Sequence, residues 1–203
     1  MRQPLPPLPG TGRPPRGLFI DHLGTLLERP KAGYLQSPEE VVFTPEALEA
    51  IFHATQAGWT LYLIGNESSV YQGLVSPETW DAIHATIQEG LRSHGICPMR
   101  SYICIDHPEG PKPFNKESVY RLPNTGAMYH AAQADGISLP TSWVIGDHTE
   151  DVAAGWRAGC HMAGVRSGEG LKDGTLQVEP EIVAENLAAV LREITSGSAL
   201  TRY

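Results

Sequence analysis

The sequence is poor in cysteine, in basic residues and in long apolar runs, and each shortage argues against a class of protein. Three cysteines among 203 residues are an odd number without framework spacing, so we expect reduced thiols. The net charge of −8 and the pI near 5.4 disfavour nucleic-acid or anionic-membrane partners, because both need clustered basic surface. No run approaches the length of a membrane span, and the N-terminus lacks a signal-peptide pattern. We therefore expect a cytoplasmic protein.

The composition is otherwise that of an ordinary globular domain, with 41% hydrophobic and 19% charged residues. A domain of this size can bury a full core without disulfides. Residues 1–16 (MRQPLPPLPGTGRPPR) are rich in proline and predict a flexible or polyproline-type tail, with a proline-motif ligand as the alternative. We expect the folded domain over residues 17–196 and a short C-terminal tail over residues 197–203.

Strand-like and helix-like patterns alternate along the predicted domain. Short apolar runs predict strands, and these runs cover residues 17–21, 60–64, 101–105, 142–145, 161–165 and 182–183. Apolar residues at helical spacing predict helices between them, with start signals at Thr44, Ser76, Thr125, Thr149 and Asn186. The alternation predicts an α/β fold with a doubly wound parallel sheet and no large cap domain. Residues 28–43 are expected to form a loop or small hairpin over the strand tips.

Two of the predicted strands end in acidic residues. Asp21 follows the first strand, and Asp147 and Asp151 follow the fourth. In a doubly wound sheet, such tips can converge on one crevice at a topological switch point. Carboxylates gathered there suit Mg²⁺, which usually binds one or two of them together with a phosphate. Each acid alone is more often a helix cap or a surface residue, so it is the placement of both groups at strand ends that favours a site.

The motifs around these acids resemble those of the haloacid dehalogenase (HAD) superfamily. Its first motif, Asp-x-Asp-Gly-Thr-Leu, is similar to residues 21–26 (DHLGTL), and its fourth motif, Gly-Asp-x-x-x-Asp, is similar to residues 146–151 (GDHTED). Within the superfamily, the chain looks most like the D,D-heptose 1,7-bisphosphate and histidinol-phosphate phosphatases, a likeness supported by residues 33–35, 58–59, 66, 104–110 and 121–123. The resemblance implies an HAD-like Rossmannoid fold and Mg²⁺-dependent hydrolysis of a small phosphorylated metabolite of the sugar-phosphate type.

The resemblance also implies a role for individual residues. Asp21 would be the nucleophile that forms an aspartyl-phosphate. The metal would be held by the carboxylates and one backbone carbonyl, from Asp21, Leu23 (carbonyl), Asp147 and Asp151. The substrate would be bound by residues at the ends of the second strand and of the later loop, namely Gly65, Asn66 and Arg121.

Three positions depart from the family pattern. The Asp that would protonate the leaving alcohol is Leu23 here, and losing a positioned acid or base typically costs about 10²–10⁴-fold in rate. The Thr or Ser whose hydroxyl would hold the phosphate is Gly65. The Lys that would offset the repulsion between nucleophile and phosphate is Leu122.

Other residues could substitute for the missing groups. Lys112 or Lys116 could supply a cation from the neighbouring loop, although neither stands at the matching position. His22 or His148 could act as an acid near neutral pH. A polar loop histidine without a chemical role is the simpler interpretation of each.

The zinc loop of this phosphatase group is incomplete. Its pattern matches only at Cys104, Asp106 stands in place of the second ligand, and no cysteine occurs between residues 105 and 159. His107 would give one further ligand, which still falls short of the four that a structural zinc needs. We therefore predict no zinc and a buried thiol at Cys104.

Three functional hypotheses follow. The first is a phosphatase by descent, with weak or lost activity, that acts on or binds a small phosphorylated metabolite. The second is a non-catalytic member that binds a phosphorylated ligand or a protein partner. The third is dehalogenase-like chemistry, in which a halide would leave without needing a proton. The missing groups leave the question of enzyme or non-enzyme open, and the sequence does not indicate an oligomeric state.

Overall fold

The computed structural model describes residues 14–197, so most of the two predicted tails lies outside the described residues. Six parallel strands form one sheet in the order β3-β2-β1-β4-β5-β6. They are β1 (Arg16–Asp21), β2 (Trp59–Ile64), β3 (Arg100–Ser101), β4 (Trp143–Gly146), β5 (His161–Val165) and β6 (Ile182–Ala184). The strand order reverses between β1 and β4, so the predicted doubly wound sheet is confirmed and its switch point lies between these two strands.

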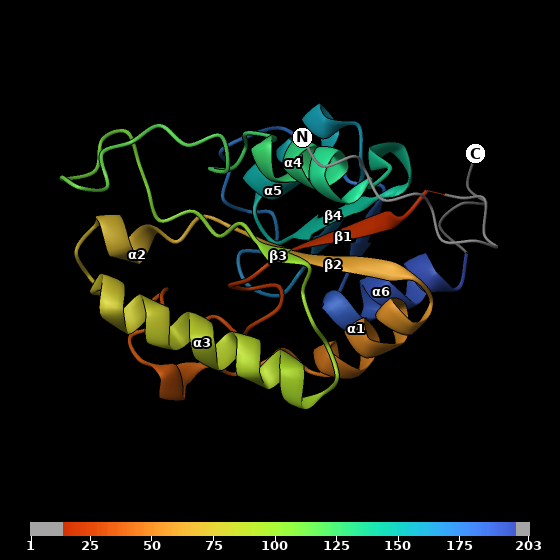
Figure 1. The fold of residues 1–203 in the computed structure, drawn as a ribbon, viewed down its shortest axis with the longest axis horizontal. Coiled ribbons are helices and arrows are strands. Elements are labelled where there is room, and N and C mark those ends of the chain that lie inside the picture. Colours follow the sequence, from red (N-terminus) through yellow and green to blue (C-terminus); the bar gives the residue numbers. More distant parts are fainter. Residues whose placement is uncertain (1–13, 198–203) are drawn as a thin grey trace.

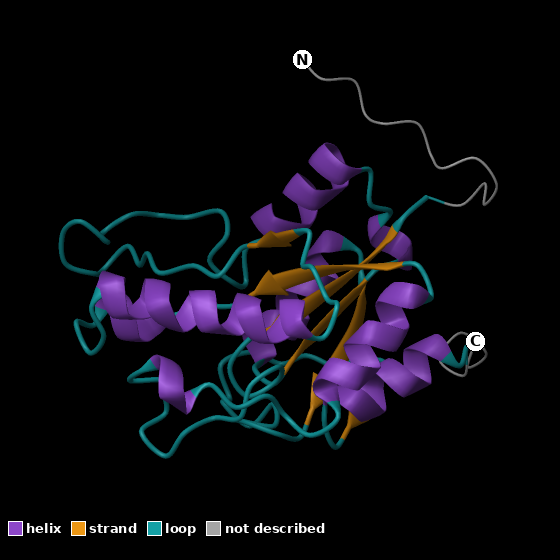
Figure 2. Ribbon diagram, turned by 60° about the horizontal axis from the view of Figure 1, so that its bottom comes forward, coloured by secondary structure: helices purple, strands orange, loops and turns teal. Residues whose placement is uncertain are grey.

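Helices cover both faces of the sheet (Figures 1 and 2). They are α1 (Ala47–Gln56), α2 (Ser68–Tyr71), α3 (Pro77–Ser93), α4 (Gly126–Asp135), α5 (Thr149–Ala158) and α6 (Leu187–Thr195), with 3₁₀ turns at Pro38–Glu40 and Leu139–Thr141. Figure 1 shows α4 and α5 on one side of the strands and α1, α3 and α6 on the other. Among the described residues, no helix is both long and apolar enough to cross a bilayer.

Strand β1 is buried on both faces, as its unbroken apolar run predicts. Leu18 and Ile20 belong to the larger core cluster, which also contains the apolar faces of α1, α3 and α6. Phe19 points to the opposite face, where it stacks on Tyr62 with ring centroids 4.8 Å apart and joins the cluster under α4 and α5. Burying each such side chain contributes about 1.5–3 kcal/mol. The strand that ends in Asp21 is therefore held rigidly from both sides.

Two of the predicted helix starts are confirmed in detail. The Ser76 hydroxyl accepts a hydrogen bond from the Thr79 amide at the start of α3. At the start of α6, the Asn186 side chain accepts a hydrogen bond from the Ala189 amide. Helix α3 buries the four predicted apolar residues, Trp80, Ile83, Ile87 and Leu91. These helices frame the sheet from which the site projects.

Other predicted boundaries were wrong, and each error has a physical cause. Thr44 does not cap α1, because its hydroxyl instead donates to the carbonyls of Thr25 and Leu26, and α1 starts after Glu46. Thr149 is the first residue of α5 rather than its cap, which is His148. Strand β3 comprises only Arg100–Ser101, at the edge of the sheet. The chain beyond it stays beside β2 and the loop after it, because the amides of residues 102 and 104 donate to the carbonyls of Leu63 and Gly65.

Candidate functional site

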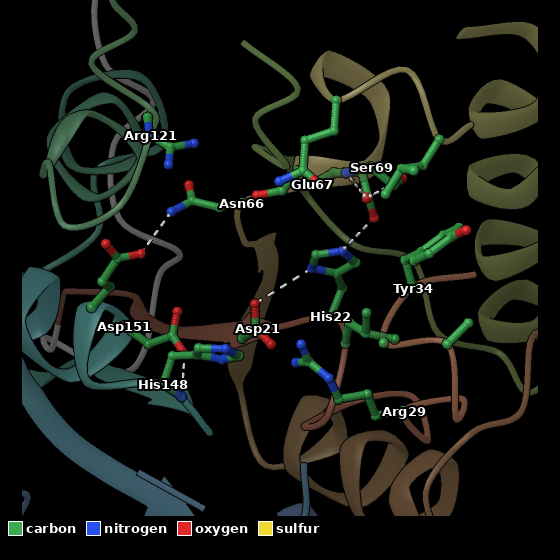
Figure 3. A pocket seen from close by; sticks show the side chains of 17 residues that line it. Asp21, His22, Arg29, Tyr34, Asn66, Glu67, Ser69, Arg121, His148 and Asp151 are labelled. Carbon is green, nitrogen blue, oxygen red and sulfur yellow. Dashed lines mark hydrogen bonds and ion pairs between the residues drawn. The ribbon is translucent and has the colours of Figure 1, made fainter. Parts of the chain in front are cut away.

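A cavity of about 390 Å³ opens at the carboxyl ends of β1, β2 and β4 (Figure 3). Five of the predicted site residues line it: Asp21, Leu23, Asn66, Arg121 and Asp151. Two do not line it. Asp147 is fully buried, and Gly65 lies against the Asp21 and His22 side chains. The sequence prediction therefore located the cavity, but only the structure shows which of the predicted residues line it and which do not.

A tight turn after β1 presents Asp21 to this cavity. The amide of Leu26 donates to the Asp21 carbonyl at 3.1 Å, and the amide of Leu27 donates to the His22 carbonyl at 2.8 Å. Gly24 has a φ of +98°, and a Cβ there would lie 2.3 Å from Oδ2 of Asp147. Only glycine suits this position, because it tolerates positive φ and leaves room for the carboxylate.

Three carboxylates are buried together at the switch point. Asp21, Asp147 and Asp151 are 5%, 0% and 3% exposed. Burial, together with the charges of Asp21 and Asp147, raises the pKa of Asp151 well above its usual value. Burial also raises the pKa of Asp21, an effect that the neighbouring His22 opposes. Buried charges of one sign need a cation or hydrogen-bond donors to be stable.

Protein donors already surround Asp147. Its Oδ2 accepts from the Glu169 amide at 2.7 Å, and its Oδ1 lies 3.3 Å from the Thr25 hydroxyl and 3.2 Å from Nδ1 of His148. Burial alone would lower the pKa of His148, but the hydrogen bond and charge of Asp147 outweigh it and raise the pKa to about 9. His148 is therefore a partner of Asp147 rather than a free loop histidine.

The residues present fit a divalent metal ion. Ligand atoms of Asp147, His148 and Asp151 lie within 4.8 Å of one another. Gly146 approaches the acids so closely that a Cβ there would lie 2.1 Å from Oδ2 of Asp151. Buried carboxylate oxygens cradled by glycine are the donors that Mg²⁺ prefers.

His22 lies in the turn after β1, and its side chain is buried. The side chain is 2% exposed, and Nε2 lies 3.2 Å from Oε2 of Glu67. The other Glu67 oxygen accepts from the amide and hydroxyl of Ser69, at 3.0 and 2.5 Å. Burial alone would lower the pKa of His22, but Asp21 and Glu67 outweigh it and raise the pKa to about 10. Glu67 was not predicted as a site residue; its position directly after the second strand's tip was the available signal.

Asn66 ties three segments together at the other side of the cavity. Its Oδ1 accepts from the Leu122 amide, and its Nδ2 donates to the Leu122 carbonyl, both at 2.9 Å. The same Nδ2 donates to Oε2 of Glu150 at 3.1 Å. The Leu122 side chain is 1% exposed and packs in the core under α4, so this segment is fixed with its side chain turned into the core.

Two arginines line the cavity. Arg121, which was predicted, has an Nη1 atom that is buried without a partner among the described residues. Arg29, which was not predicted, lies in the 28–43 loop, with Nη2 3.3 Å from Oε1 of Glu169. Neither Lys112 nor Lys116 lines the cavity. Positive charge therefore comes to this cavity from arginine and histidine side chains.

The segment around Cys104, where we predict no zinc, is held by other contacts. The buried Cys104 thiol donates to the carbonyl of Asp106 at 3.6 Å, which confirms the predicted burial. The His107 ring stacks on Tyr71 with centroids 4.5 Å apart, and its Nδ1 accepts from the Glu109 amide. The exclusion of zinc itself stays a prediction.

This fold, with acids at the tips of β1 and β4, defines the class of HAD-like proteins, and comparison with known proteins agrees. Residues 119–190 match the HAD-hydrolase-like family model. The D-glycero-D-manno-heptose-1,7-bisphosphate 7-phosphatase of Thermosynechococcus vestitus is 30% identical over 190 residues, which cover 89% of this chain and 96% of that protein. The D-glycero-beta-D-manno-heptose-1,7-bisphosphate 7-phosphatase of Bordetella bronchiseptica is 31% identical over 179 residues, which cover 87% and 96%.

Solved structures give the same result. The D,D-heptose 1,7-bisphosphate phosphatase from B. bronchiseptica, complexed with magnesium and phosphate, superposes with a TM-score of 0.75 at 29% identity, covering 89% of this chain and 98% of that one. A putative HAD-like phosphatase from Mesorhizobium loti gives a TM-score of 0.73 at 25% identity, covering 95% and 91%. The chain belongs to the D,D-heptose 1,7-bisphosphate phosphatase family of the HAD superfamily.

Proposed function

We propose that this protein binds a small phosphorylated metabolite of the sugar-phosphate type together with Mg²⁺, and that it hydrolyses the phosphate ester slowly. The observation that carries the proposal is the burial of three interacting carboxylates at the carboxyl ends of β1 and β4: Asp21 and Asp151 line an open cavity, and Asp147 is fully buried. Three facing carboxylates are costly without a counter-charge, and a bound cation would supply it. The relative from B. bronchiseptica that was solved with magnesium and phosphate supports the same pairing of metal and anion.

The metal would be held by the carboxylates of Asp21, Asp147 and Asp151 and by the Leu23 carbonyl. When bound, Mg²⁺ neutralises negative charge and orients a phosphate. Thr25, the Glu169 amide and His148 hold Asp147 through hydrogen bonds, so the carboxylate does not need to reorganise when a ligand arrives.

Asp21 would act as the nucleophile. One of its carboxylate oxygens would form a bond to phosphorus while the bond from phosphorus to the leaving oxygen breaks. The leaving alkoxide then needs a proton. In the second step a water molecule would attack phosphorus and give up a proton, and the bond from phosphorus to Asp21 would break, which releases phosphate and restores the carboxylate. Leu23 lines the cavity beside Asp21 but has no proton to give, so the rate with a sugar phosphate should fall by about 10²–10⁴-fold relative to a site with an acid there.

This reasoning predicts a dependence on the leaving group. An aryl phosphate leaves without protonation, so we expect Mg²⁺-dependent hydrolysis of p-nitrophenyl phosphate to exceed that of an alkyl sugar phosphate. Asp21→Asn should abolish both activities, and its circular-dichroism spectrum should match that of the unmodified protein. Turnover that survives Asp21→Asn would contradict the proposed chemistry.

Restoring the acid gives a sharper test. Leu23 is 9% exposed and borders the cavity, so Leu23→Asp can place its carboxyl toward the ligand. The comparison is made on the first step, the release of the leaving alcohol in a rapid-mixing experiment, because the restored Asp would also help water attack the aspartyl-phosphate in the second step with either substrate. We expect release of the sugar to accelerate by about 10²–10⁴-fold while release of the aryl alcohol changes little. Leu122→Lys is a poorer choice, because position 122 faces the core and a lysine there would be buried without a partner. An equal gain with both substrates would refute the assignment of the missing group to proton transfer.

A non-catalytic role is the second candidate. It is favoured by the turn of the Leu122 side chain into the core, which leaves no lysine near the nucleophile among the residues that line the cavity. This role predicts measurable binding of a phosphorylated ligand with Mg²⁺ and no turnover of either substrate type. A burst of aryl alcohol in a rapid-mixing experiment would exclude it, because the burst requires Asp21 to accept the phosphoryl group.

A further inference from the structure

We propose that His22 binds the phosphate group of the ligand through its Nδ1–H, held in place by Glu67 and given room by the absence of a side chain at position 65. This inference deepens the proposed function and rests on it. Figure 3 shows the ring between the two carboxylates, at the wall of the cavity next to Asp21.

The first argument is an unused donor. Nδ1 of His22 is buried and has no hydrogen-bond partner among the described residues. Oδ1 of Asp21 is 3.4 Å away, a contact of opposite charges that lacks the alignment of a hydrogen bond. Leaving a buried donor unsatisfied is costly, so such atoms in a cavity wall indicate a ligand or water that would accept from them. When a phosphate group is positioned so that Asp21 can attack its phosphorus, one of its oxygens would lie beside Nδ1 of His22.

The second argument is the fixed orientation of the ring. Nε2 donates to Glu67, and the rest of the Glu67 carboxylate is held by Ser69, so the acceptor cannot turn away. The edge of Trp80 contacts the ring with centroids 5.8 Å apart and planes at 75°. A carboxylate oxygen faces each ring nitrogen, at 3.2 Å for Nε2 and 3.4 Å for Nδ1, an arrangement that favours a hydrogen on both. Nδ1–H is therefore directed and charge-assisted, which is the kind of hydrogen bond that phosphate oxygens accept most strongly.

The third argument is steric. Gly65 has a φ of +144°, and a Cβ built there would lie 2.2 Å from Nδ1 of His22 and 2.7 Å from Oδ1 of Asp21. Any other residue would push the ring away from this place. The glycine at the end of β2 and the histidine after Asp21 therefore form one unit. In this unit the His22 ring supplies a hydrogen-bond donor and a positive charge beside Asp21, in the space that a side chain at position 65 would otherwise fill.

The inference is tested by the affinity for inorganic phosphate in the presence of Mg²⁺, measured by isothermal titration calorimetry on the full chain. His22→Ala should weaken binding by about 10- to 100-fold, as expected for the loss of one charge-assisted hydrogen bond. His53→Ala is the matched control, because His53 is an exposed residue of α1 that does not line the cavity, and it should bind as the unmodified protein does.

His22→Ala leaves Glu67 buried without its partner, so the variant could unfold. The double variant His22→Ala/Glu67→Gln removes both charges and keeps a side chain that can accept from Ser69. If either folded variant binds phosphate as tightly as the unmodified protein, the inference is overturned while the proposed function stands. If the unmodified protein itself binds no phosphate with Mg²⁺, both are overturned.

Discussion

The close contact between Gly65 and His22 predicts an energetic coupling that can be measured without any ligand. Gly65→Ala combines two costs: a side chain at positive φ, about 1–2 kcal/mol, and an overlap with His22 and Asp21, about 1–3 kcal/mol. Gly58→Ala is the matched control, because Gly58 also has a positive φ, of +87°, but no atom lies within 4 Å of the place that its Cβ would take. The stabilities are compared by urea unfolding followed by tryptophan fluorescence.

The overlap is isolated by repeating both changes in a His22→Ala background. Removing the imidazole relieves the 2.2 Å contact but leaves the 2.7 Å contact with Oδ1 of Asp21, so Gly65→Ala should cost less there than in the unmodified protein, by the His22 share of the overlap cost of about 1–3 kcal/mol. The cost of Gly58→Ala should be the same in both backgrounds to within about 0.5 kcal/mol. If the cost of Gly65→Ala is also unchanged by His22→Ala, the ring does not occupy the place that the structure assigns to it.

Two further predictions concern the acids. Asp151→Asn removes a carboxylate that is buried beside two others, Asp21 and Asp147, so the metal-free variant should melt at a higher temperature than the metal-free unmodified protein. The variant should also lose the stabilisation that Mg²⁺ gives the unmodified protein. An equal effect of Mg²⁺ on both melting temperatures would contradict a metal site there. Asp173 is partly buried, which opposes ionisation, but hydrogen bonds from Thr149 outweigh this and lower its pKa from 3.8 to about 2. Because the folded-state pKa is depressed, the stabilisation by Asp173 is fully present above about pH 4 and disappears as the pH falls to about 2. The difference in unfolding free energy between the unmodified protein and Asp173→Asn, measured by urea titration, should therefore shrink between these two pH values. A difference that stays constant would refute the prediction. The effect should be modest, because the group is largely solvated and screened.

The sheet and the position of the acids could be predicted because they depend on local patterns. Alternating strands and helices imply a parallel sheet, and parallel strands end at one edge. The sequence therefore indicated that Asp21 and Asp147 would lie at one edge of the sheet, and the charge of Asp147 helps to raise the pKa of Asp21. The motif at residues 146–151 added the third acid without any knowledge of packing. These features needed only the order of the residues along the chain.

The environment of His22 could not be predicted in the same way. Its burial depends on Glu67, which is 45 residues away, and on the space left by Gly65. In the sequence, Gly65 indicated the loss of a hydroxyl, and no local pattern indicated that the loop histidine at position 22 would be buried. The orientation of Leu122 was hidden for a similar reason, because the double hydrogen bond from Asn66 joins residues 56 positions apart.

The contact between residues 22 and 65 also constrains how the site can be redesigned. A Cβ at position 65 would lie 2.2 Å from Nδ1 of His22, so a larger residue there carries the cost of the overlap as long as the imidazole is in place. Introducing a serine or threonine at position 65 therefore calls for a smaller residue at position 22 in the same variant. A library that varies the two positions together would sample combinations that single substitutions cannot reach without losing stability.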